Sequence, residues 1–145
     1  MAVTLDDDAR QYLETFEEVT GADGIDCIID TGADGARVQL TIVVASGQLG
    51  EAIGPDGRTV TQFQERIGLP VRLVENADDP EAFVTNAFAP ATVYNVTISE
   101  NNDTVAYVEV ADSDRGVAIG SNGRTIETVR RLAARHCGID DVQLI

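Results

Sequence analysis

Lysine and tryptophan are absent from the sequence, and cysteine is rare. Without lysine, the chain cannot form the Gly-Lys-Ser/Thr end of a P-loop, and it also lacks the Gly-x-Gly-x-x-Gly fingerprint of a Rossmann fold. The two cysteines, Cys27 and Cys137, are too few for a disulfide framework or a zinc knuckle, so we expect two free, partly buried thiols. We therefore expect no enzyme, no cofactor, no metal site and no small-molecule substrate.

Long hydrophobic runs are also missing. No stretch approaches the roughly 18–20 apolar residues that a membrane-spanning helix requires. The first residues, MAVTLDDDAR, have neither the basic region nor the apolar region of a signal peptide. Hydrophobic residues nevertheless make up 43% of the chain, which is enough for a packed core. We expect a cytoplasmic globular protein with no membrane partner.

Charge is strongly one-sided. The 145 residues include 25 acidic and 10 basic ones, all of the latter arginine, and the net charge is -15. Such a charge repels itself in dilute buffer, whereas concentrated salt screens the repulsion. Because the acidic, lysine-free composition resembles that of proteins from extreme halophiles, we interpret the acidity as an adaptation to the solvent. The alternative interpretation is an acidic surface that binds a basic protein.

One short phrase occurs twice in the chain. Residues 50–60 read GEAIGPDGRTV and residues 116–126 read GVAIGSNGRTI, with seven of eleven positions identical. The flanking segments repeat as well, since the patterns of apolar residues predict the same order of elements around each copy. That order is helix, strand, strand, short helix, Gly-x-x-Gly, helix and strand. An internal repeat of this kind indicates two similar structural units.

The elements follow from apolar spacing and from turn residues. Helices are predicted over 6–21 and 78–90, and after each Gly-x-x-Gly loop, where apolar residues recur at helical spacing until Gly68 or Gly138. Strands are predicted over residues 25–30, 36–44, 71–75, 93–99, 104–111 and 142–145. Ile53 and Ile119 are expected to anchor the short helices in the core. The aromatic residues expected in the core are Phe83, Phe88, Tyr94 and Tyr107.

A Gly-x-x-Gly loop between two helices suits a phosphate group. Glycine admits positive φ angles and leaves room for a ligand to approach the backbone. The helix that follows offers unpaired N–H groups and a positive dipole end. Arg58 and Arg124, which directly follow the second glycine of each loop, add a side chain that stays charged.

The phrases AIGPDGRTV and AIGSNGRTI resemble the signature of the KH domain, whose Gly-x-x-Gly loop clamps single-stranded nucleic acid. Each unit carries an extra helix and strand in front of the core, which resembles the type II KH domain. The resemblance implies an α+β fold with two tandem type II KH domains, residues 1–76 and 77–145. Each would be α-β-β-α-α-β, with a three-stranded sheet and helices on one face. Two such domains resemble the archaeal NusA-like transcription factors.

The resemblance also implies the site residues. The first clamp would consist of Gly54, Pro55, Asp56, Gly57 and Arg58. The second clamp would consist of Gly120, Ser121, Asn122, Gly123 and Arg124. Asp56 places a carboxylate where a phosphate should approach, whereas the middle residues of the second loop are neutral. We therefore expect the second loop to be the better RNA site.

Arginine placement agrees with this ranking. Residues 115–135 contain five arginines and one acidic residue, Glu127, and residues 57–72 contain three arginines and Glu65. An alternative is that the arginines near the end of the last helix only complement its dipole.

A Cys–His nucleophile at His136 and Cys137 is not expected, because adjacent helix positions point about 100° apart. The carboxylate pairs Asp78–Asp79 and Asp140–Asp141 are expected to be solvated surface.

These observations predict a single-stranded RNA-binding transcription factor that acts in termination, pausing or elongation. RNA polymerase and other transcription proteins are its expected protein partners. Two alternatives remain open: a KH-fold scaffold that binds proteins instead of RNA, and a KH module that acts in ribosome assembly. Because the chain has no tryptophan and only seven other aromatic residues, recognition through stacked aromatic side chains is not expected.

Overall fold

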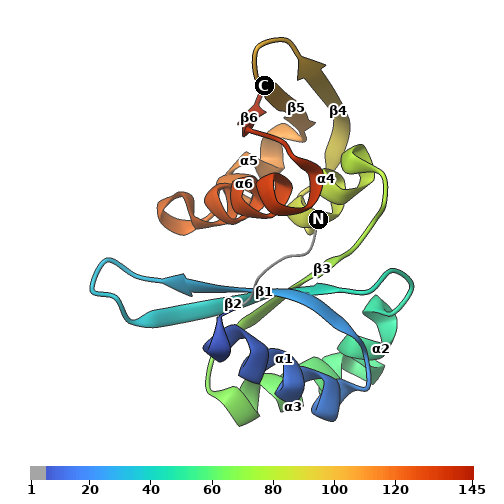
Figure 1. Cartoon of the computed structure of the whole chain (residues 1–145), viewed down its shortest axis with the longest axis vertical. Coiled ribbons are helices and arrows are strands. Elements are labelled where there is room, and N and C mark those ends of the chain that lie inside the picture. The colour runs from blue at the N-terminus through green and yellow to red at the C-terminus, as the bar shows by residue number, and fades with distance from the viewer. Residues whose placement is uncertain (1–5) are drawn as a thin grey trace. The chain divides into compact units, whose positions relative to one another are not determined.

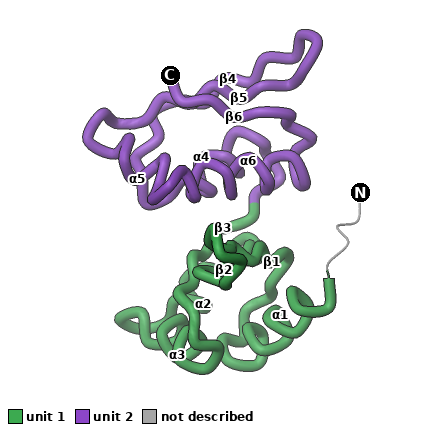
Figure 2. Tube along the Cα trace, turned by 90° about the vertical axis from the view of Figure 1, so that its left-hand side faces the viewer, with its two compact units in different colours: residues 1–76 green, residues 77–145 purple. Residues whose placement is uncertain are grey.

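A computed structural model of the chain describes residues 6–145. Residues 1–5, which belong to the segment in which no signal peptide is expected, lie outside the described residues. The chain divides into two compact units, residues 1–76 and residues 77–145 (Figure 2). Each unit contains its own sheet and its own helices (Figure 1).

The first unit has a mixed three-stranded sheet. Its strand order is β1-β2-β3, with β1 and β2 antiparallel and β2 and β3 parallel. The helices of this unit lie on one face of the sheet (Figure 1). The elements are α1 (Asp7–Thr20), β1 (Gly24–Thr31), β2 (Arg37–Val44), α2 (Leu49–Ile53), a 3₁₀ turn (Pro55–Gly57), α3 (Arg58–Ile67) and β3 (Val71–Glu75).

The second unit repeats this order. Its sheet has the order β4-β5-β6, again with one antiparallel and one parallel pair. The elements are α4 (Pro80–Phe88), β4 (Val93–Glu100), β5 (Thr104–Val110), a 3₁₀ turn (Asp112–Asp114), α5 (Arg115–Ile119), a 3₁₀ turn (Ser121–Gly123), α6 (Arg124–Cys137) and β6 (Asp141–Leu144). The α+β class and the order α-β-β-α-α-β in both units confirm the fold expected from the sequence.

Helix ends coincide with the residues that the sequence indicates. The Asp6 carboxylate accepts a hydrogen bond from the backbone N–H of Ala9 at 2.7 Å, which caps α1. Asp79 caps α4 in the same way, with Pro80 as the first helical residue. Helices α3 and α6 end at Gly68 and Gly138, both in the left-handed conformation that glycine adopts without strain.

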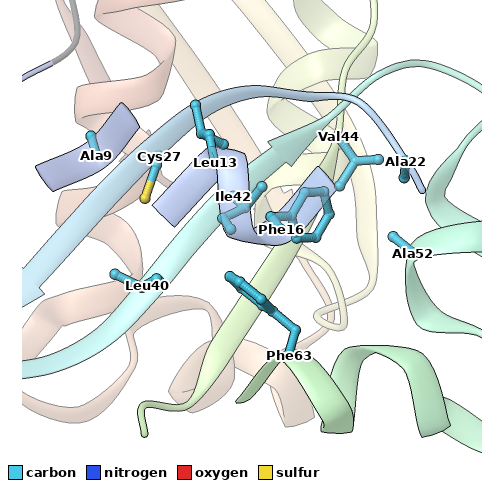
Figure 3. Packing of buried hydrophobic residues seen from close by; sticks show 10 residues of the cluster. All are labelled: Ala9, Leu13, Phe16, Ala22, Cys27, Leu40, Ile42, Val44, Ala52 and Phe63. Carbon is cyan, nitrogen blue, oxygen red and sulfur yellow. The ribbon is translucent and has the colours of Figure 1, made fainter. Parts of the chain in front are cut away.

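The core of the first unit lies between its helices and its sheet (Figure 3). Phe16 of α1 and Phe63 of α3 are fully buried, and their rings meet edge to face with centroids 5.3 Å apart. Each buried phenylalanine contributes roughly 1.5–3 kcal/mol of hydrophobic stabilisation. The core therefore joins the helix that precedes the sheet to the helix that follows the Gly-x-x-Gly loop.

In the second unit, α6 buries the apolar face that the sequence predicts. The residues Ile126, Val129, Leu132 and Ala133 of α6 are all buried, as the spacing predicts. Phe83 and Phe88 of α4 are fully buried as well. Tyr94, however, is 67% exposed, so the expectation of a core position is wrong. The pairing of β4 with β5 shifts between Val93 and Asn95. This bulge takes Tyr94 out of the alternation of inward-facing and outward-facing side chains along β4.

Candidate nucleic-acid interface

The two Gly-x-x-Gly loops have the same backbone shape. Each loop follows a five-residue helix, α2 or α5, and leads directly into α3 or α6. The first glycines, Gly54 and Gly120, have φ/ψ of 74°/175° and 78°/171°, a region that is essentially restricted to glycine. The second glycines, Gly57 and Gly123, are left-handed, with φ of 72° and 74°. Both glycines of each loop are therefore required by the backbone.

The third loop position also has a positive φ. Asp56 has φ/ψ of 53°/28° and Asn122 has 56°/27°. Asp and Asn are among the few residues other than glycine that adopt this conformation readily. The aspartate in the first loop therefore has a structural explanation, because it suits the backbone even though its charge does not suit a phosphate.

Short hydrogen bonds close each loop. The N–H of Gly57 donates to the carbonyl of Gly54, and the N–H of Gly123 donates to the carbonyl of Gly120, both at 3.1 Å. These bonds use the N–H of the fourth loop residue. At the second loop position Ser121 keeps a backbone N–H, whereas Pro55 has none. The second loop therefore has one backbone donor more than the first.

The arginines that follow the loops differ in their surroundings. The Arg58 guanidinium lies 3.7 Å from the Asp56 carboxylate, and both side chains are exposed. Arg124 is half-buried and, among the residues that the structure describes, has no side-chain hydrogen bond or ion pair. The positive charge beside the first loop is thus partly neutralised within the protein, whereas the charge of Arg124 is not.

Several other arginines of the predicted basic segments have structural partners. Arg130 of α6 contacts Glu127 and lies 3.1 Å from the Asp141 carboxylate, and it also donates to the carbonyl of Val142. Arg115 donates to the carbonyl of Ile145 at 3.0 Å. These two arginines tie α5 and α6 to the last strand and its end. The five arginines of residues 115–135 are therefore not a single set of free cations.

The isoleucines before the loops are not core anchors. Ile53 is 38% exposed and Ile119 is 40% exposed, so the expectation that they hold the short helices in the core is wrong. The preceding alanines, Ala52 and Ala118, are fully buried instead. In both five-residue helices the alanine is the one buried residue. The exposed isoleucines add apolar surface next to each loop.

The sequence predicts no functional role for Cys137, His136 or Asp140, and each has an ordinary structural environment. Both cysteines are free, and burial raises the pKa of the Cys137 thiol above its usual value, with Asp79 adding to the shift. Such a thiol is a poor nucleophile. The His136 ring lies against the ring of Phe83, with centroids 5.3 Å apart. The Asp140 carboxylate is exposed but accepts a hydrogen bond from the backbone N–H of Thr104.

Residues 6–145 contain neither a metal-binding cluster nor a membrane-spanning helix. Within residues 6–145, no group of three or more histidine, cysteine, aspartate or glutamate side chains is arranged to hold a metal ion. No helix in the same part of the chain is long and apolar enough to cross a membrane.

One pair of residues beside the loops was not among the predicted site residues. Thr59 and Thr125 are the second residues of α3 and α6, and their side chains lie directly against the first loop glycines. The sequence repeat could have pointed to these residues, because the threonine is one of the seven positions that are identical in the two copies.

Comparison with known proteins gives the family of the chain. A model of the NusA-like second KH domain matches residues 80–140. The probable transcription termination protein NusA of Halococcus morrhuae is 54% identical over 99% of this chain and 99% of its own length. Its counterparts are 49% identical in Halobacterium salinarum, over 99% of both chains, and 30% identical in Methanococcus vannielii, over 100% of this chain and 81% of the relative.

A solved structure has the same fold. The crystal structure of APE1850 superposes with a TM-score of 0.78 at 26% identity, covering 97% of this chain and 100% of that one. The relatives are named for transcription and not for an enzymatic reaction. The relatives include proteins of halophilic archaea, which agrees with the halophile-like composition of this chain. With an identity of 54% along nearly the whole of both chains, the protein belongs to the archaeal NusA-like family.

Proposed function

We propose that this protein is a single-stranded RNA-binding transcription factor that acts in termination, pausing or elongation. The name of its relatives, probable transcription termination protein NusA, supports the transcriptional role. The KH fold supports the RNA role, because KH domains hold single-stranded nucleic acid at the Gly-x-x-Gly loop. In this proposal the clamps are residues 54–58 and 120–124, in the units formed by residues 1–76 and 77–145.

The second loop is the principal site in this proposal. The observation that carries it is Arg124, which follows a loop of neutral residues and has no side-chain partner within the described chain. Ser121 also contributes a backbone N–H that the first loop lacks. A phosphate at this loop would meet backbone donors, the N-terminal end of α6 and an unpaired guanidinium.

Binding in concentrated salt must rely on contacts other than counterion release. That contribution falls as salt rises. Backbone hydrogen bonds are short-range, and so is the packing of bases on aliphatic surface. Val117 and Ile119 of α5 are 45% and 40% exposed, directly before the second loop. They supply the apolar surface on which bases would pack.

Fluorescence anisotropy of short single-stranded RNAs in molar KCl tests the proposal. The variant Ser121→Asp with Asn122→Asp places two carboxylates in the second loop, so we expect it to lose most of the binding. The matched control is Asn101→Asp with Asn102→Asp, which adds the same charge at exposed positions of the hairpin between β4 and β5. The control should bind RNA as the wild type does.

Two results would contradict the proposal. Equal loss of binding in both variants would mean that net charge matters and the loop does not. A folded wild type that binds none of the RNAs would favour a scaffold that contacts proteins only. Co-purification of a tagged chain then identifies the assembly: RNA polymerase or another transcription protein is the partner that we propose, and ribosomal particles would indicate ribosome assembly instead.

A further inference from the structure

The first glycine of each loop is confined by a threonine of the following helix. A Cβ atom built on Gly120 would lie 2.4 Å from the Thr125 Oγ1 and 2.8 Å from its Cβ. A Cβ atom on Gly54 would lie 2.0 Å from the Thr59 Oγ1 and 2.6 Å from its Cβ. The threonine side chain therefore fills the space that a side chain on the glycine would occupy.

The second glycine of each loop has no such neighbour. A Cβ atom on Gly57 or Gly123 would meet nothing within 4 Å. The second glycine is thus required only for its left-handed backbone, whereas the first is required for its backbone and for the threonine. This asymmetry is the same in both units, although their middle loop residues differ.

The contact links the two ends of the loop. Gly120 is the first loop residue, and Thr125 is the second residue of α6, five positions later. Between them, the N–H of Gly123 donates to the carbonyl of Gly120. The Oγ1 atom of the threonine lies nearest to the space beside Gly120, so it limits how far the loop can move toward α6. Backbone hydrogen bonds from the N–H groups of Gly123 and Arg124 hold the loop from inside, and this side chain supports it from its far end.

We propose that Thr125, and Thr59 in the first unit, are positioning residues that hold the Gly-x-x-Gly loop in its RNA-binding shape. This inference rests on the proposed function. The threonine acts through the first glycine, and the RNA contacts remain with the loop and Arg124. Without the threonine side chain the loop has room to move, and RNA must then order it on binding.

Thr125→Ala and Thr125→Ser separate this role from general packing. Serine keeps the Oγ1 atom that lies nearest to Gly120, and alanine removes it. We expect the affinity for single-stranded RNA to fall about tenfold in the alanine variant, the cost of ordering roughly one more backbone residue. The serine variant should bind within about twofold of wild type, a difference smaller than one typical contact. Thr61→Ala, at an exposed position of α3, controls for the change in helix propensity.

NMR order parameters of the loop amides give a readout that does not depend on RNA. We expect residues 121–123 to fall from about 0.85, typical of rigid backbone, to below about 0.6 in Thr125→Ala. Unchanged order parameters and unchanged affinity in this variant would overturn the positioning role and leave the proposed function standing. If the wild type binds no RNA, the proposed function fails, and the order parameters alone decide whether the threonine positions the loop.

Discussion

At the residue scale, the two glycines of one loop should tolerate a side chain differently. Gly123→Ala imposes only a left-handed backbone on alanine, which costs about 1–2 kcal/mol of unfolding free energy. Gly120→Ala should cost more, because its backbone region is essentially restricted to glycine and its Cβ would collide with Thr125. Urea unfolding measures both costs.

The double variant Gly120→Ala with Thr125→Ala serves as the control for this difference. It removes the contact with the Thr125 Oγ1 but keeps the Cβ and the backbone N of residue 125, each 2.8 Å from the added Cβ, so we expect it to recover only part of the lost stability. The threonine contact would be contradicted if the losses of stability in Gly120→Ala and Thr125→Ala simply added up in the double variant. It would also be contradicted if Gly120→Ala and Gly123→Ala lowered stability equally.

Asp56 is the residue that separates the two loops in charge. Asn adopts the left-handed conformation as Asp does, so Asp56→Asn should preserve the loop and remove the carboxylate near Arg58. In the background of Ser121→Asp with Asn122→Asp, residual RNA binding reports the first loop. We expect Asp56→Asn to raise that residual affinity by up to about fivefold, the range of one exposed charge pair. An unchanged or lower RNA affinity, measured by fluorescence anisotropy, would show that the first loop does not contact RNA.

At the element scale, Asp141 at the start of β6 links this strand to α6. A hydrogen bond from the Gln143 side chain, with smaller contributions from the Val142 N–H and Arg130, holds the pKa of the Asp141 carboxyl below its usual value, against a weaker opposing effect of burial. A lowered carboxyl pKa stabilises the fold above the unfolded value of about 3.9, and the contribution is lost as pH falls through the folded value.

We therefore expect Asp141→Asn to lower stability at pH 7 by at most about 1 kcal/mol, since the pair with Arg130 is partly exposed. Urea unfolding between pH 7 and pH 3 should show this difference shrinking toward acid. Asp78→Asn makes the same change in net charge at an exposed position and should show no such trend. A difference that stays constant or grows toward acid would contradict the stabilising role of the ionised carboxyl.

The elements themselves were predictable where a periodic pattern was long. The buried face of α6 and the limits of β3 follow directly from apolar spacing and from the glycines that end the helices. The short helices were not predictable in this way, because the residues Ala-Ile before each loop do not indicate which of the two is buried. Tyr94 was misassigned because a bulge shifts the alternation of β4, and the sequence pattern does not mark it.

The loops were predictable as a motif but not as a geometry. The repeat identified the glycines and arginines. The contact between Thr125 and Gly120 depends on backbone angles, and so does the absence of a partner for Arg124. These properties arise from packing between residues of the loop and the next helix, and they required the structure.

At the scale of the whole molecule, the net charge of -15 should make stability depend on salt. The screening length falls from about 10 Å at 0.1 M salt to about 3 Å at 1 M. We expect the thermal midpoint, followed by circular dichroism, to rise by at least about 5 °C between 0.1 M and 2 M KCl, which is roughly 1 kcal/mol for a domain of this size.

A variant with fewer acidic residues separates screening from general salt effects. Asp78→Asn, Glu100→Gln and Asp112→Asn together remove three exposed negative charges. The midpoint of this variant should rise less with KCl than that of the wild type. An equal rise would mean that charge repulsion is not the cause.

The most direct test of the central claim, that RNA is held at the second loop, is amide NMR of the chain titrated with single-stranded RNA in molar KCl. We predict that the largest chemical-shift changes fall on residues 120–125, with smaller changes on residues 54–59. Changes that leave residues 120–125 unaffected, or that concentrate on a surface without a Gly-x-x-Gly loop, would contradict the account.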